Sequence, residues 1–405
     1  MRLYNTLTGR LEDFTPRTPG TPVTIYACGI TPYDVSHLGH ALVGLTYDVL
    51  TRYLQYCGYA TRYVQNVTDI DDDILRKAAE VGVPWDELGR QQTAAYLEAM
   101  DRLNIRRPDV YPKATEETPG MIAIIGRLLE RGHAYERGGN IYFRVASDPE
   151  YGKLSRYDRE EMLRIAAERG GKPDDPLKDD PLDFLLWQAA APGEPSWPSP
   201  WGPGRPGWHI ECSAMSMRYL GETVDIHGGG SDLIFPHHES EIAQSEGSTG
   251  KPFVRYWMHV GMLRYEGEKM SKSLGNLVMV PRLLEHYSPD AIRLCLLGHR
   301  YRDSWDFEEG AMEDAQALAD ELAVAVRLED APEGMAEEER GIVDSELTRF
   351  EFRRAMDDDL DTPAAVAVLR EHAWQIRAGQ ERGSDIREAQ ESLRELADVL
   401  GLTLS

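Results

Sequence analysis

Apolar and polar residues alternate along the first quarter of the chain in a pattern typical of strands followed by helices. The strand-like runs are 23–28 and 60–67, and the segments with apolar residues every three or four positions are 38–56, 74–81 and 85–103. Strands that alternate with helices pair in parallel through right-handed crossovers. The pattern therefore predicts an α/β fold with a parallel sheet, whose ligands bind where the strands end, near Gly29 and Thr68.

The rest of the chain divides into segments of different character. From residue 308 onward the pattern is helical, with apolar positions that include Leu322, Val326, Leu347 and Phe350, which predicts a small antiparallel C-terminal α-helical bundle. We expect five parts: the first half of the α/β domain, an insertion, the second half of that domain, a polar lysine-bearing loop region and the bundle. Their expected bounds are 1–105, 106–200, 201–262, 263–310 and 311–405.

The composition is that of an ordinary globular protein, with 41% hydrophobic and 28% charged residues. No apolar run approaches the roughly 18–20 residues that span a bilayer, and the N-terminus lacks the layout of a signal peptide. The four cysteines are too sparse for a disulfide framework and fit a reducing compartment. We expect a cytoplasmic monomer that does not associate with membranes.

The charge is strongly acidic, with 44 basic and 69 acidic residues and a net charge of −25. A long nucleic-acid footprint usually needs a basic surface. Residues 311–405 carry 24 acidic residues, 10 arginines and no lysine, so the bundle is a poor surface for phosphates. The charge lowers the weight of a nucleic-acid partner, although a local basic patch is compatible with it.

The strand at 23–28 leads through a polar turn into a helix that begins near His37. Unpaired backbone N–H groups and the helix dipole make such a helix start a site for phosphate. His37 and His40 share one face of the first turn, and Gly39 between them allows a close approach to the backbone. The alternative, a helix that carries two histidines without a role, stays open at this point.

Cysteine, histidine and glutamate side chains suited to a metal occur at four places. Cys28 ends the first strand, Cys212 lies in a second regular segment, and His237 and Glu241 are four residues apart and so share a helix face. Two thiolates, an imidazole and a carboxylate suit Zn²⁺. There is no C-x-x-C spacing, however, and two buried cysteines far apart in sequence are more often core residues.

Two further stretches have the character of ligand-binding loops. Gly228, Gly229 and Gly230 follow a short apolar run and precede Asp232, which indicates backbone packed closely against a ligand. Lys269 and Lys272 lie on a polar loop, and mobile ammonium groups suit the charge that develops on a leaving pyrophosphate. A flexible turn and a solvated surface loop are the alternatives.

Together these stretches resemble the catalytic domain of class I aminoacyl-tRNA synthetases. His37-Leu38-Gly39-His40 matches the HIGH signature of that family, and the segment 269–273, Lys-Met-Ser-Lys-Ser, matches its KMSKS signature. Both matches are highly specific, and their order and separation are right. The resemblance covers essentially the whole chain, because further segments are similar to the cysteine-activating branch, at 28–34, 66–69, 207–213 and 228–239.

The resemblance implies a Rossmann-like HUP fold, with 263–310 as the KMSKS loop and stem-contact region, and an ATP-dependent ligase that forms cysteinyl-adenylate. In the mechanism of the family, the cysteine carboxylate attacks the α-phosphate of ATP, which binds with Mg²⁺. The catalytic residues would be His37, His40, Lys269 and Lys272. The residues that bind ATP would be His37, His40, Gly228, Gly229, Gly230, Asp232, Met262 and Lys272.

The resemblance further implies one zinc ion per chain, which would select the substrate because a thiolate binds Zn²⁺ far better than a hydroxyl does. The ligands would be Cys28, Cys212, His237 and Glu241, although the position of Glu241 could instead be left to the substrate. The residues near the substrate would be Gly29, Thr31, Thr68, Trp208 and His238, with His238 and Asp34 assisting the transfer step.

The cysteine-activating branch contains two activities that differ in the acceptor. One is cysteinyl-tRNA synthetase, and the other is the ligase that joins cysteine to glucosaminyl-inositol in mycothiol synthesis. The segments 30–32, 277–280 and 301–306, the acidic bundle and the end of the chain where the synthetase would continue into an anticodon-reading domain favour the ligase. Glu241 and the segment 213–217 favour the synthetase. We therefore predict a small-molecule amine acceptor, with tRNA as the alternative.

Two other classes of protein share part of the pattern. The HxGH nucleotidylyltransferases have the first signature, but they are generally much shorter and lack the metal-ligand candidates of 207–241. A non-catalytic synthetase paralogue that acts as a binding module would be expected to have lost a signature residue, and none is lost here.

Overall fold

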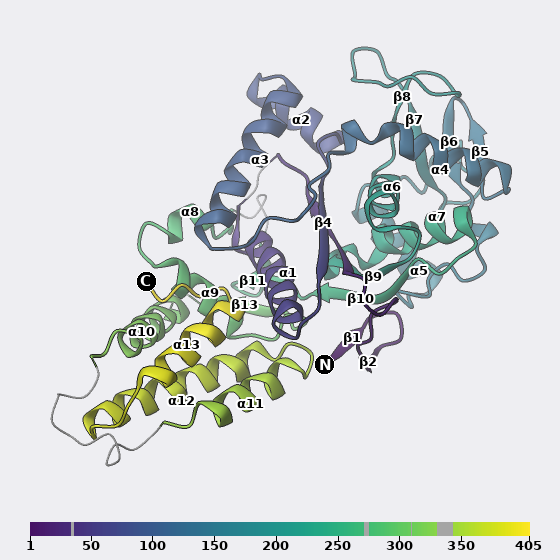
Figure 1. The fold of residues 1–405 in the computed structure, drawn as a ribbon. Helices are drawn as coiled ribbons and strands as arrows, with labels where there is room; N and C mark the ends of the chain where they lie inside the picture. The colour runs from purple at the N-terminus through teal and green to yellow at the C-terminus, as the bar shows by residue number, and fades with distance from the viewer. Residues whose placement is uncertain (34–35, 271–274, 309, 330–342) are drawn as a thin grey trace.

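A four-stranded parallel sheet forms the centre of the computed structural model, which describes residues 1–33, 36–270, 275–308, 310–329 and 343–405 (Figure 1). The strands lie in the order β10 (Val254–Val260), β9 (Val224–Gly230), β3 (Val23–Ile30) and β4 (Thr61–Val67). Every neighbouring pair is parallel, so the predicted α/β class with a parallel sheet is confirmed.

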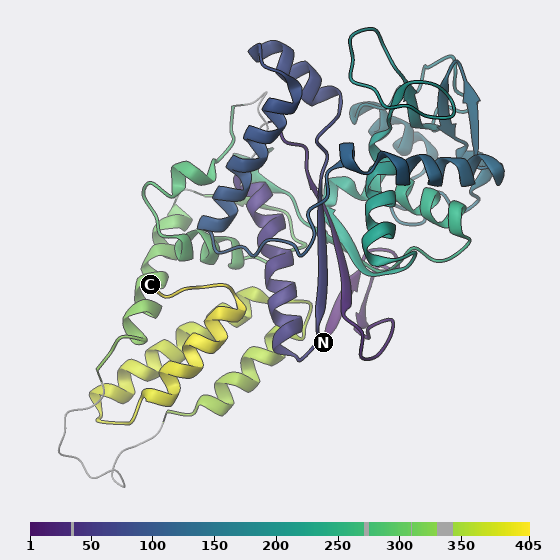
Figure 2. The same cartoon turned by 45° about the horizontal axis from the view of Figure 1, so that its top comes forward.

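Helices cover both faces of this sheet, with α1 (Leu38–Tyr56) on one face and α6 (Trp208–Leu220) on the other (Figure 2). Successive side chains of a strand point to opposite faces. Ile25 therefore joins the hydrophobic core that contains α1, whereas Tyr26 and Cys28 join the core that contains α6. This alternation is what turns the Cys28 thiol toward the second half of the chain.

The strand order reverses at β3, which has β4 on one side and β9 on the other. A crevice forms outside the carboxyl ends of the strands at such a switch point. The chain leaves β4 into α2 (Asp72–Val81) and α3 (Trp85–Arg102), which lie beyond those strand ends.

The residues between α3 and α6 fold into a lobe beside the sheet, at the upper right of Figure 1. An antiparallel sheet in the order β5-β6-β7-β8 and two helices build it. These elements are α4 (Thr118–Glu130), β5 (Ala134–Arg137), β6 (Asn140–Phe143), α5 (Arg159–Glu168), β7 (Phe184–Ala189) and β8 (Gly204–Pro206). The lobe shares the apolar core of α6 and of α7 (Glu239–Thr249), so it packs firmly against the central sheet.

Smaller elements lie at the edges of the sheet. An N-terminal hairpin joins β1 (Arg2–Asn5) to β2 (Arg10–Asp13). After β10, the order β12-β11-β13 makes a small sheet. Its strands and the helices near it are β11 (Leu263–Tyr265), β12 (Glu268–Lys269), α8 (Val280–Leu283), α9 (Pro289–Leu297) and β13 (Trp305–Phe307).

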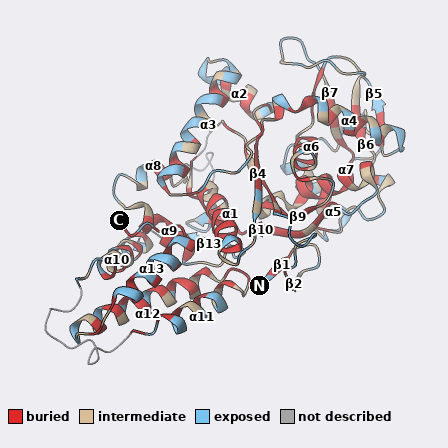
Figure 3. Ribbon diagram, in the orientation of Figure 1, coloured by how far each residue is buried: buried red, intermediate tan, exposed pale blue. Residues whose placement is uncertain are grey.

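The C-terminal part is helical, with elements α10 (Gly310–Ala325), α11 (Ser345–Met356), α12 (Thr362–Glu381) and α13 (Arg387–Val399). The expected apolar face of α11 is wrong at two positions, since Leu347 and Phe350 are 53% and 64% exposed. The buried face of α11 instead carries Thr348, Phe352 and Met356, and the spacing of 347 and 350 places both on its outer side. Figure 3 shows exposed residues, in pale blue, along α11. No helix in the described parts of the chain is long and apolar enough to cross a membrane.

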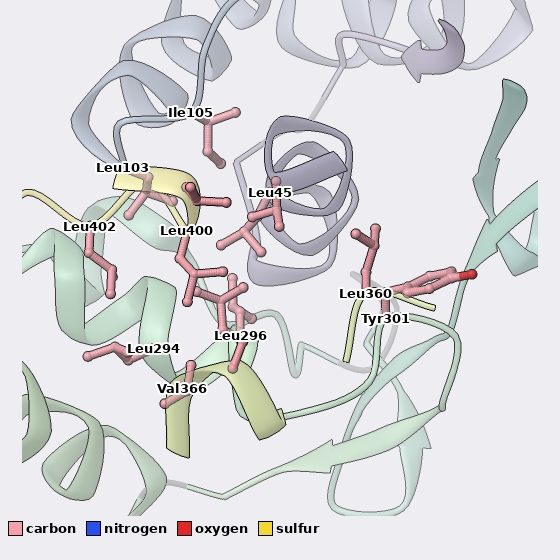
Figure 4. Close-up of a cluster of buried hydrophobic side chains, with 14 of the residues drawn as sticks. Leu45, Leu103, Ile105, Leu294, Leu296, Tyr301, Leu360, Val366, Leu400 and Leu402 are labelled. Atoms are coloured by element: carbon pink, nitrogen blue, oxygen red, sulfur yellow. The ribbon is translucent and has the colours of Figure 1, made fainter. Parts of the chain in front are cut away.

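The bundle is joined to the central α/β domain through a shared hydrophobic core. Leu45 of α1, Leu296 of α9, Val366 of α12 and Leu400 after α13 meet in it (Figure 4). The fully buried guanidinium of Arg293 crosses the same contact and donates to Asp48 of α1 and to the carbonyl oxygen of Leu400. The position of the helix that begins at His37 therefore depends on the C-terminal helices.

Candidate active site

A cavity of about 1050 Å³ opens at the switch point of the sheet. It lies between the carboxyl end of β3, the helix α2 and the inserted lobe. Of the predicted site residues, those that line the cavity are Cys28, Gly29, Thr31, His37, His40, Trp208, Gly230, Asp232 and Met262. The cavity therefore collects residues from both halves of the α/β domain.

The two signature histidines stand at the start of α1. The backbone of His37 is extended and its Nδ1 accepts a hydrogen bond from the Gly39 N–H at 3.1 Å, so His37 is the N-cap of the helix. The rings of His37 and His40 stack with centroids 3.9 Å apart. Both imidazoles thus sit together at a helix N-terminus and face the cavity, which is the arrangement that favours an anionic ligand.

The segment after the lysine loop is hydrogen-bonded to the start of α1. The Leu38 N–H donates to the Val278 carbonyl at 2.9 Å, and the Val280 N–H donates to the Ser36 carbonyl at 2.9 Å. Lys269 ends β12, while Lys272 and Asp34 lie outside the described residues. The segment that follows the second signature is therefore joined to the first by backbone hydrogen bonds on either side of His37.

The four predicted metal ligands meet directly beneath the cavity floor. One ligand atom from each of Cys28, Cys212, His237 and Glu241 lies within 4.8 Å of the others, and all four residues are buried. The two sulfur atoms are 3.5 Å apart, and the Glu241 carboxylate is 3.4 Å from the Cys28 Sγ and 3.0 Å from the His237 Nε2. Four donors from β3, α6, the turn before α7 and α7 thus converge on one point.

Charge in this buried cluster is balanced among the donors. Burial and the charge of Glu241 raise the pKa of Cys212, but the hydrogen bond with Cys28 and the interaction with His237 outweigh them and lower the pKa to about 6. Burial also raises the pKa of Glu241, and the charges of His227 and His237 hold it well below its ordinary value. A thiolate and a carboxylate are therefore available inside the protein.

The cluster fits zinc by the chemistry of its donors. Two thiols, an imidazole and a carboxylate are a donor set that Zn²⁺ prefers, and their convergence leaves room for a single ion. The Glu241 Oε2 atom is buried and forms no hydrogen bond of good geometry in the described structure, where the His227 Nε2 lies 3.2 Å from it. Such an atom is expected where a cation completes the site.

A second group of donors shares two residues with the first. Cys28 and Glu241 also lie within 4.8 Å of His227 and His238. His227, in β9, is 3.2 Å from the Glu241 Oε2, and the sequence patterns above did not single it out. The sequence feature that could have identified His227 is its place within an apolar run, directly before three glycines. His238 Nδ1 is 2.7 Å from the His259 Nε2, which ties it to β10.

Residues expected near the substrate occupy different places. Trp208 lines the cavity and stacks on His237 with centroids 4.3 Å apart. Gly29 is required by packing, since a Cβ there would be 1.7 Å from the Asn66 carbonyl oxygen. Thr68 is buried, donates to Glu211 at 2.9 Å and does not itself line the cavity. Of Thr68 and Glu211, it is Glu211 that faces the cavity.

The glycine run has a different cause from the one expected. A Cβ at Gly228 would be 1.6 Å from the Met258 carbonyl oxygen, and one at Gly229 would be 2.9 Å from Leu233. These two glycines are absent from the described lining of the cavity. Gly228 is needed for the close packing of β9 and β10, and Gly229 leaves room for the Leu233 side chain. Only Gly230 of the three reaches the cavity.

Comparisons with known proteins agree with this geometry. Residues 15–317 match the family described as tRNA synthetases class I (C) catalytic domain, and residues 351–405 match the DALR domain. The cysteine--tRNA ligase of Dehalococcoides mccartyi is 47% identical over 100% of this chain and 86% of its own length. That of Syntrophotalea carbinolica is 45% identical over 100% of this chain and 85% of its own length.

Solved structures extend the likeness to the fold. Mycobacterium tuberculosis methionyl-tRNA synthetase in complex with methionyl-adenylate matches with a TM-score of 0.66 at 16% identity, over 94% of this chain and 89% of that one. At that identity the match shows a shared fold and carries no information about the substrate.

Proposed function

The chain belongs to the class I aminoacyl-tRNA synthetases and is an ATP-dependent ligase, and from this premise we propose that it activates L-cysteine and transfers it to tRNA. The observation that carries the proposal is the convergence of Cys28, Cys212, His237 and Glu241 beneath a cavity that also holds His37 and His40. A thiol-selective floor and a phosphate-binding helix start within one cavity suit the activation of cysteine by ATP.

The cavity residues divide the work of adenylate formation. His37 and His40 would contact the phosphates of ATP at the N-terminus of α1 and stabilise the charge of the in-line transition state. Gly230, Asp232 and Met262, which also line the cavity, would hold the adenosine. Lys269 and Lys272 would act on the β- and γ-phosphates, and Mg²⁺ would accompany ATP. In this chemistry the protein positions the reactants and stabilises charge.

Selection of cysteine would take place at the floor of the cavity. Zinc, when held by Cys28, Cys212, His237 and Glu241, would supply a Lewis acid that binds the substrate thiol as a thiolate and discriminates against a hydroxyl. Trp208, stacked on His237, closes one side of the pocket. Gly29 and Thr31 lie beside Cys28 and shape the pocket from β3, while His238 supports the Cys28 side chain at 3.3 Å.

The comparisons change the expectation about the molecule that accepts the activated cysteine. Both relatives described above are cysteine--tRNA ligases, and they are similar over the whole of this chain. This supports tRNA over glucosaminyl-inositol, and the mycothiol-type amine acceptor predicted from the sequence is not supported by these relatives. In this proposal 1–105 and 201–262 are the two halves of the catalytic domain, 106–200 is the connective insertion, 263–310 is the KMSKS and stem-contact region and 311–405 is the helical bundle.

Two assays test the proposal in sequence. ATP–pyrophosphate exchange is expected to be stimulated by cysteine and not by serine. The protein is then given ATP, cysteine and either a tRNA(Cys) transcript or glucosaminyl-inositol, and the expected product is cysteinyl-tRNA. Exchange without any charging of tRNA, together with amide formation on glucosaminyl-inositol, would refute tRNA as the acceptor. An absence of cysteine-dependent exchange would refute the activation step itself.

A further inference from the structure

A row of hydrogen-bonding side chains leads from the Cys28 sulfur to the segment that follows β1. The His238 Nε2 lies 3.3 Å from the Cys28 Sγ, and the His238 Nδ1 lies 2.7 Å from the His259 Nε2. The His259 Nδ1 lies 2.8 Å from the Thr6 hydroxyl oxygen. Thr6, His259 and His238 thus form one continuous histidine chain, and none of the three belongs to the described lining of the cavity.

The members of the histidine chain come from three separate elements and are held in place by them. His259 lies in β10 and His238 in the turn before α7, and their side chains are 6% and 0% exposed. The Thr6 N–H donates to the Trp257 carbonyl, and the Thr6 carbonyl accepts from Arg156, both at 2.9 Å. Since both backbone groups of Thr6 are engaged with other residues, its hydroxyl can direct its proton toward His259.

A metal-bound thiolate at Cys28 fixes the direction of every hydrogen bond in the histidine chain. A thiolate only accepts, so the His238 Nε2 must carry the proton that it donates to Cys28. A neutral imidazole has a single N–H, so the His238 Nδ1 accepts from the His259 Nε2–H. The His259 Nδ1 in turn accepts from the Thr6 hydroxyl. All four ring nitrogens are then paired, and each ring is held in one tautomer.

The expected ligand set needs a donor of this kind. Two thiolates and a carboxylate carry one negative charge more than Zn²⁺ neutralises, and the residues that supply them are buried. Excess charge that is removed from water is costly unless hydrogen bonds stabilise it. His238 directs an N–H at this charge, and the loss of such a partner of a metal ligand lowers metal affinity by about 10–100-fold.

His238 also lies close enough to the donor atoms to be a ligand itself. It belongs to the second donor group, with Cys28, His227 and Glu241. However, its Nε2 is 3.9 Å from the Glu241 carboxylate, whereas the His237 Nε2 is 3.0 Å from it. Only the first donor group contains both thiols, which Zn²⁺ favours. His238 therefore fits the role of a donor to a ligand better than the role of a ligand.

We propose, on the basis of the proposed function, that the histidine chain positions the zinc-bound Cys28 thiolate and stabilises its charge. Thr6 and His259 are positioning residues, because they act through His238, whose tautomer they fix. The hydrogen bond at the end of the chain draws electron density from the Cys28 thiolate, which leaves the ion better able to bind the thiolate of the substrate.

The test removes the hydroxyl that begins the chain. Thr6→Val keeps the shape of the side chain and is expected to lower zinc affinity about fivefold, the value for one hydrogen bond of typical strength. His259→Phe, which removes both ring nitrogens, is expected to lower it by about tenfold or more. Competition with a chromophoric chelator measures both changes. Thr6→Ser keeps the hydroxyl and is expected to retain the zinc affinity of the wild type.

The cobalt-substituted protein supplies a second readout that a purely structural role of Thr6 would not change. A thiolate that loses a hydrogen bond donates electrons more readily, so its charge-transfer absorption is expected to move to longer wavelength in Thr6→Val and not in Thr6→Ser. Thr348→Val is the matched control, because the Thr348 hydroxyl lies 3.0 Å from the His372 Nδ1 in the bundle, outside the donor set. It is expected to lower the stability in urea unfolding and to leave zinc affinity and the cobalt spectrum unchanged.

Three results would overturn the inference. One is a Thr6→Val variant with the zinc affinity and the cobalt spectrum of the wild type. Another is a loss of zinc affinity in Thr6→Val with an unchanged cobalt spectrum, since Thr6 would then have only a structural role. The third is a Thr6→Ser variant that behaves like Thr6→Val. Wild-type protein that holds no zinc would instead refute the metal site of the proposed function.

Discussion

Replacement of Arg293 by methionine tests how far the signature helix depends on the C-terminal bundle. The guanidinium donates to Asp48 at 2.8 Å, to the Leu103 carbonyl at 2.9 Å and to the Leu400 carbonyl at 3.0 Å, and both charged side chains are fully buried. Methionine fills a similar volume but leaves the two carbonyl groups and one carboxylate oxygen without this donor.

The expected loss of stability follows from the polar groups that Arg293→Met leaves without a partner. Breaking a buried ion pair by removing one partner costs about 3–5 kcal/mol, and each orphaned buried acceptor costs about 1–3 kcal/mol. Asp48 keeps a second donor, because the Arg52 Nε lies 2.9 Å from its other oxygen. We therefore expect Arg293→Met to lower the free energy of unfolding by about 4 kcal/mol.

The assay is urea unfolding followed by tryptophan fluorescence, with amide hydrogen exchange to locate the loss of protection. Faster exchange is expected in α1, in α9 and around Leu400, because these segments meet at the guanidinium. Arg370→Met is the matched control: Arg370 is 69% exposed and 3.7 Å from Glu321, so its loss should cost no more than about 1 kcal/mol.

Two outcomes would contradict this reasoning. One is a destabilisation by Arg293→Met no larger than that of Arg370→Met. The other is a double variant, Asp48→Leu with Arg293→Met, whose cost equals the sum of the single variants. Residues in one ion-pair network are coupled, so removal of both charges should cost less than that sum.

Three further predictions concern the metal cluster, the glycine run and Asp71, the N-cap of α2. Cys212→Ser should lower zinc retention after dialysis at least tenfold and remove the thiolate-to-metal absorption of the cobalt-substituted protein. Cys295→Ser, buried in α9 outside the donor set, should leave both unchanged. Equal zinc content in the two variants would exclude Cys212 as a ligand. Gly228→Ala should destabilise the protein by more than about 2 kcal/mol in urea unfolding, because the new Cβ would overlap the Met258 carbonyl. Gly126→Ala in α4, where the new Cβ would meet no atom within 4 Å, should stabilise the protein by about 0.5–1 kcal/mol. Similar effects of the two substitutions would refute the packing argument. Burial raises the pKa of Asp71 to about 6, so the stability linked to its protonated form is present at low pH and is lost as the pH rises through 6. Asp71→Asn, which can still cap α2, should therefore be more stable than the wild type by about 3 kcal/mol at pH 8 and little different at pH 4. A stability difference that does not depend on pH would contradict this.

The alternation of apolar runs along 23–103 was sufficient to predict the parallel strands β3 and β4 and the helices that follow them. The helix predicted for 38–56 is α1 (Leu38–Tyr56), and the strand predicted for 60–67 is β4 (Thr61–Val67). Local patterns succeed here because the period of side-chain exposure differs between strands and helices. They failed at Leu347 and Phe350, where the exposed side of α11 carries apolar residues and only the packing of α12 and α13 defines which side is inner.

In the candidate site, too, local sequence patterns predict some features, while others depend on tertiary packing. The signature residues and the donor types could be read from the chain, since their chemistry is a property of the residues themselves. The glycine run could be located but not explained, because the partner of Gly228 is a carbonyl of β10, thirty residues away. His227 went unnoticed, since a histidine in a strand has no local sign of the carboxylate beside it.

The sequence by itself determined which chemistry this protein can perform: a helix start with two histidines, a lysine-bearing loop and a set of thiol, imidazole and carboxylate groups. Only the tertiary structure decided that Cys28 meets Glu241 across 213 residues of chain, and that His238 is linked through His259 to the Thr6 hydroxyl. The physical reason is that pattern and propensity act between near neighbours in sequence, whereas the burial and pairing of charges depend on contacts that exist only once the sheet, the inserted lobe and the bundle have packed together.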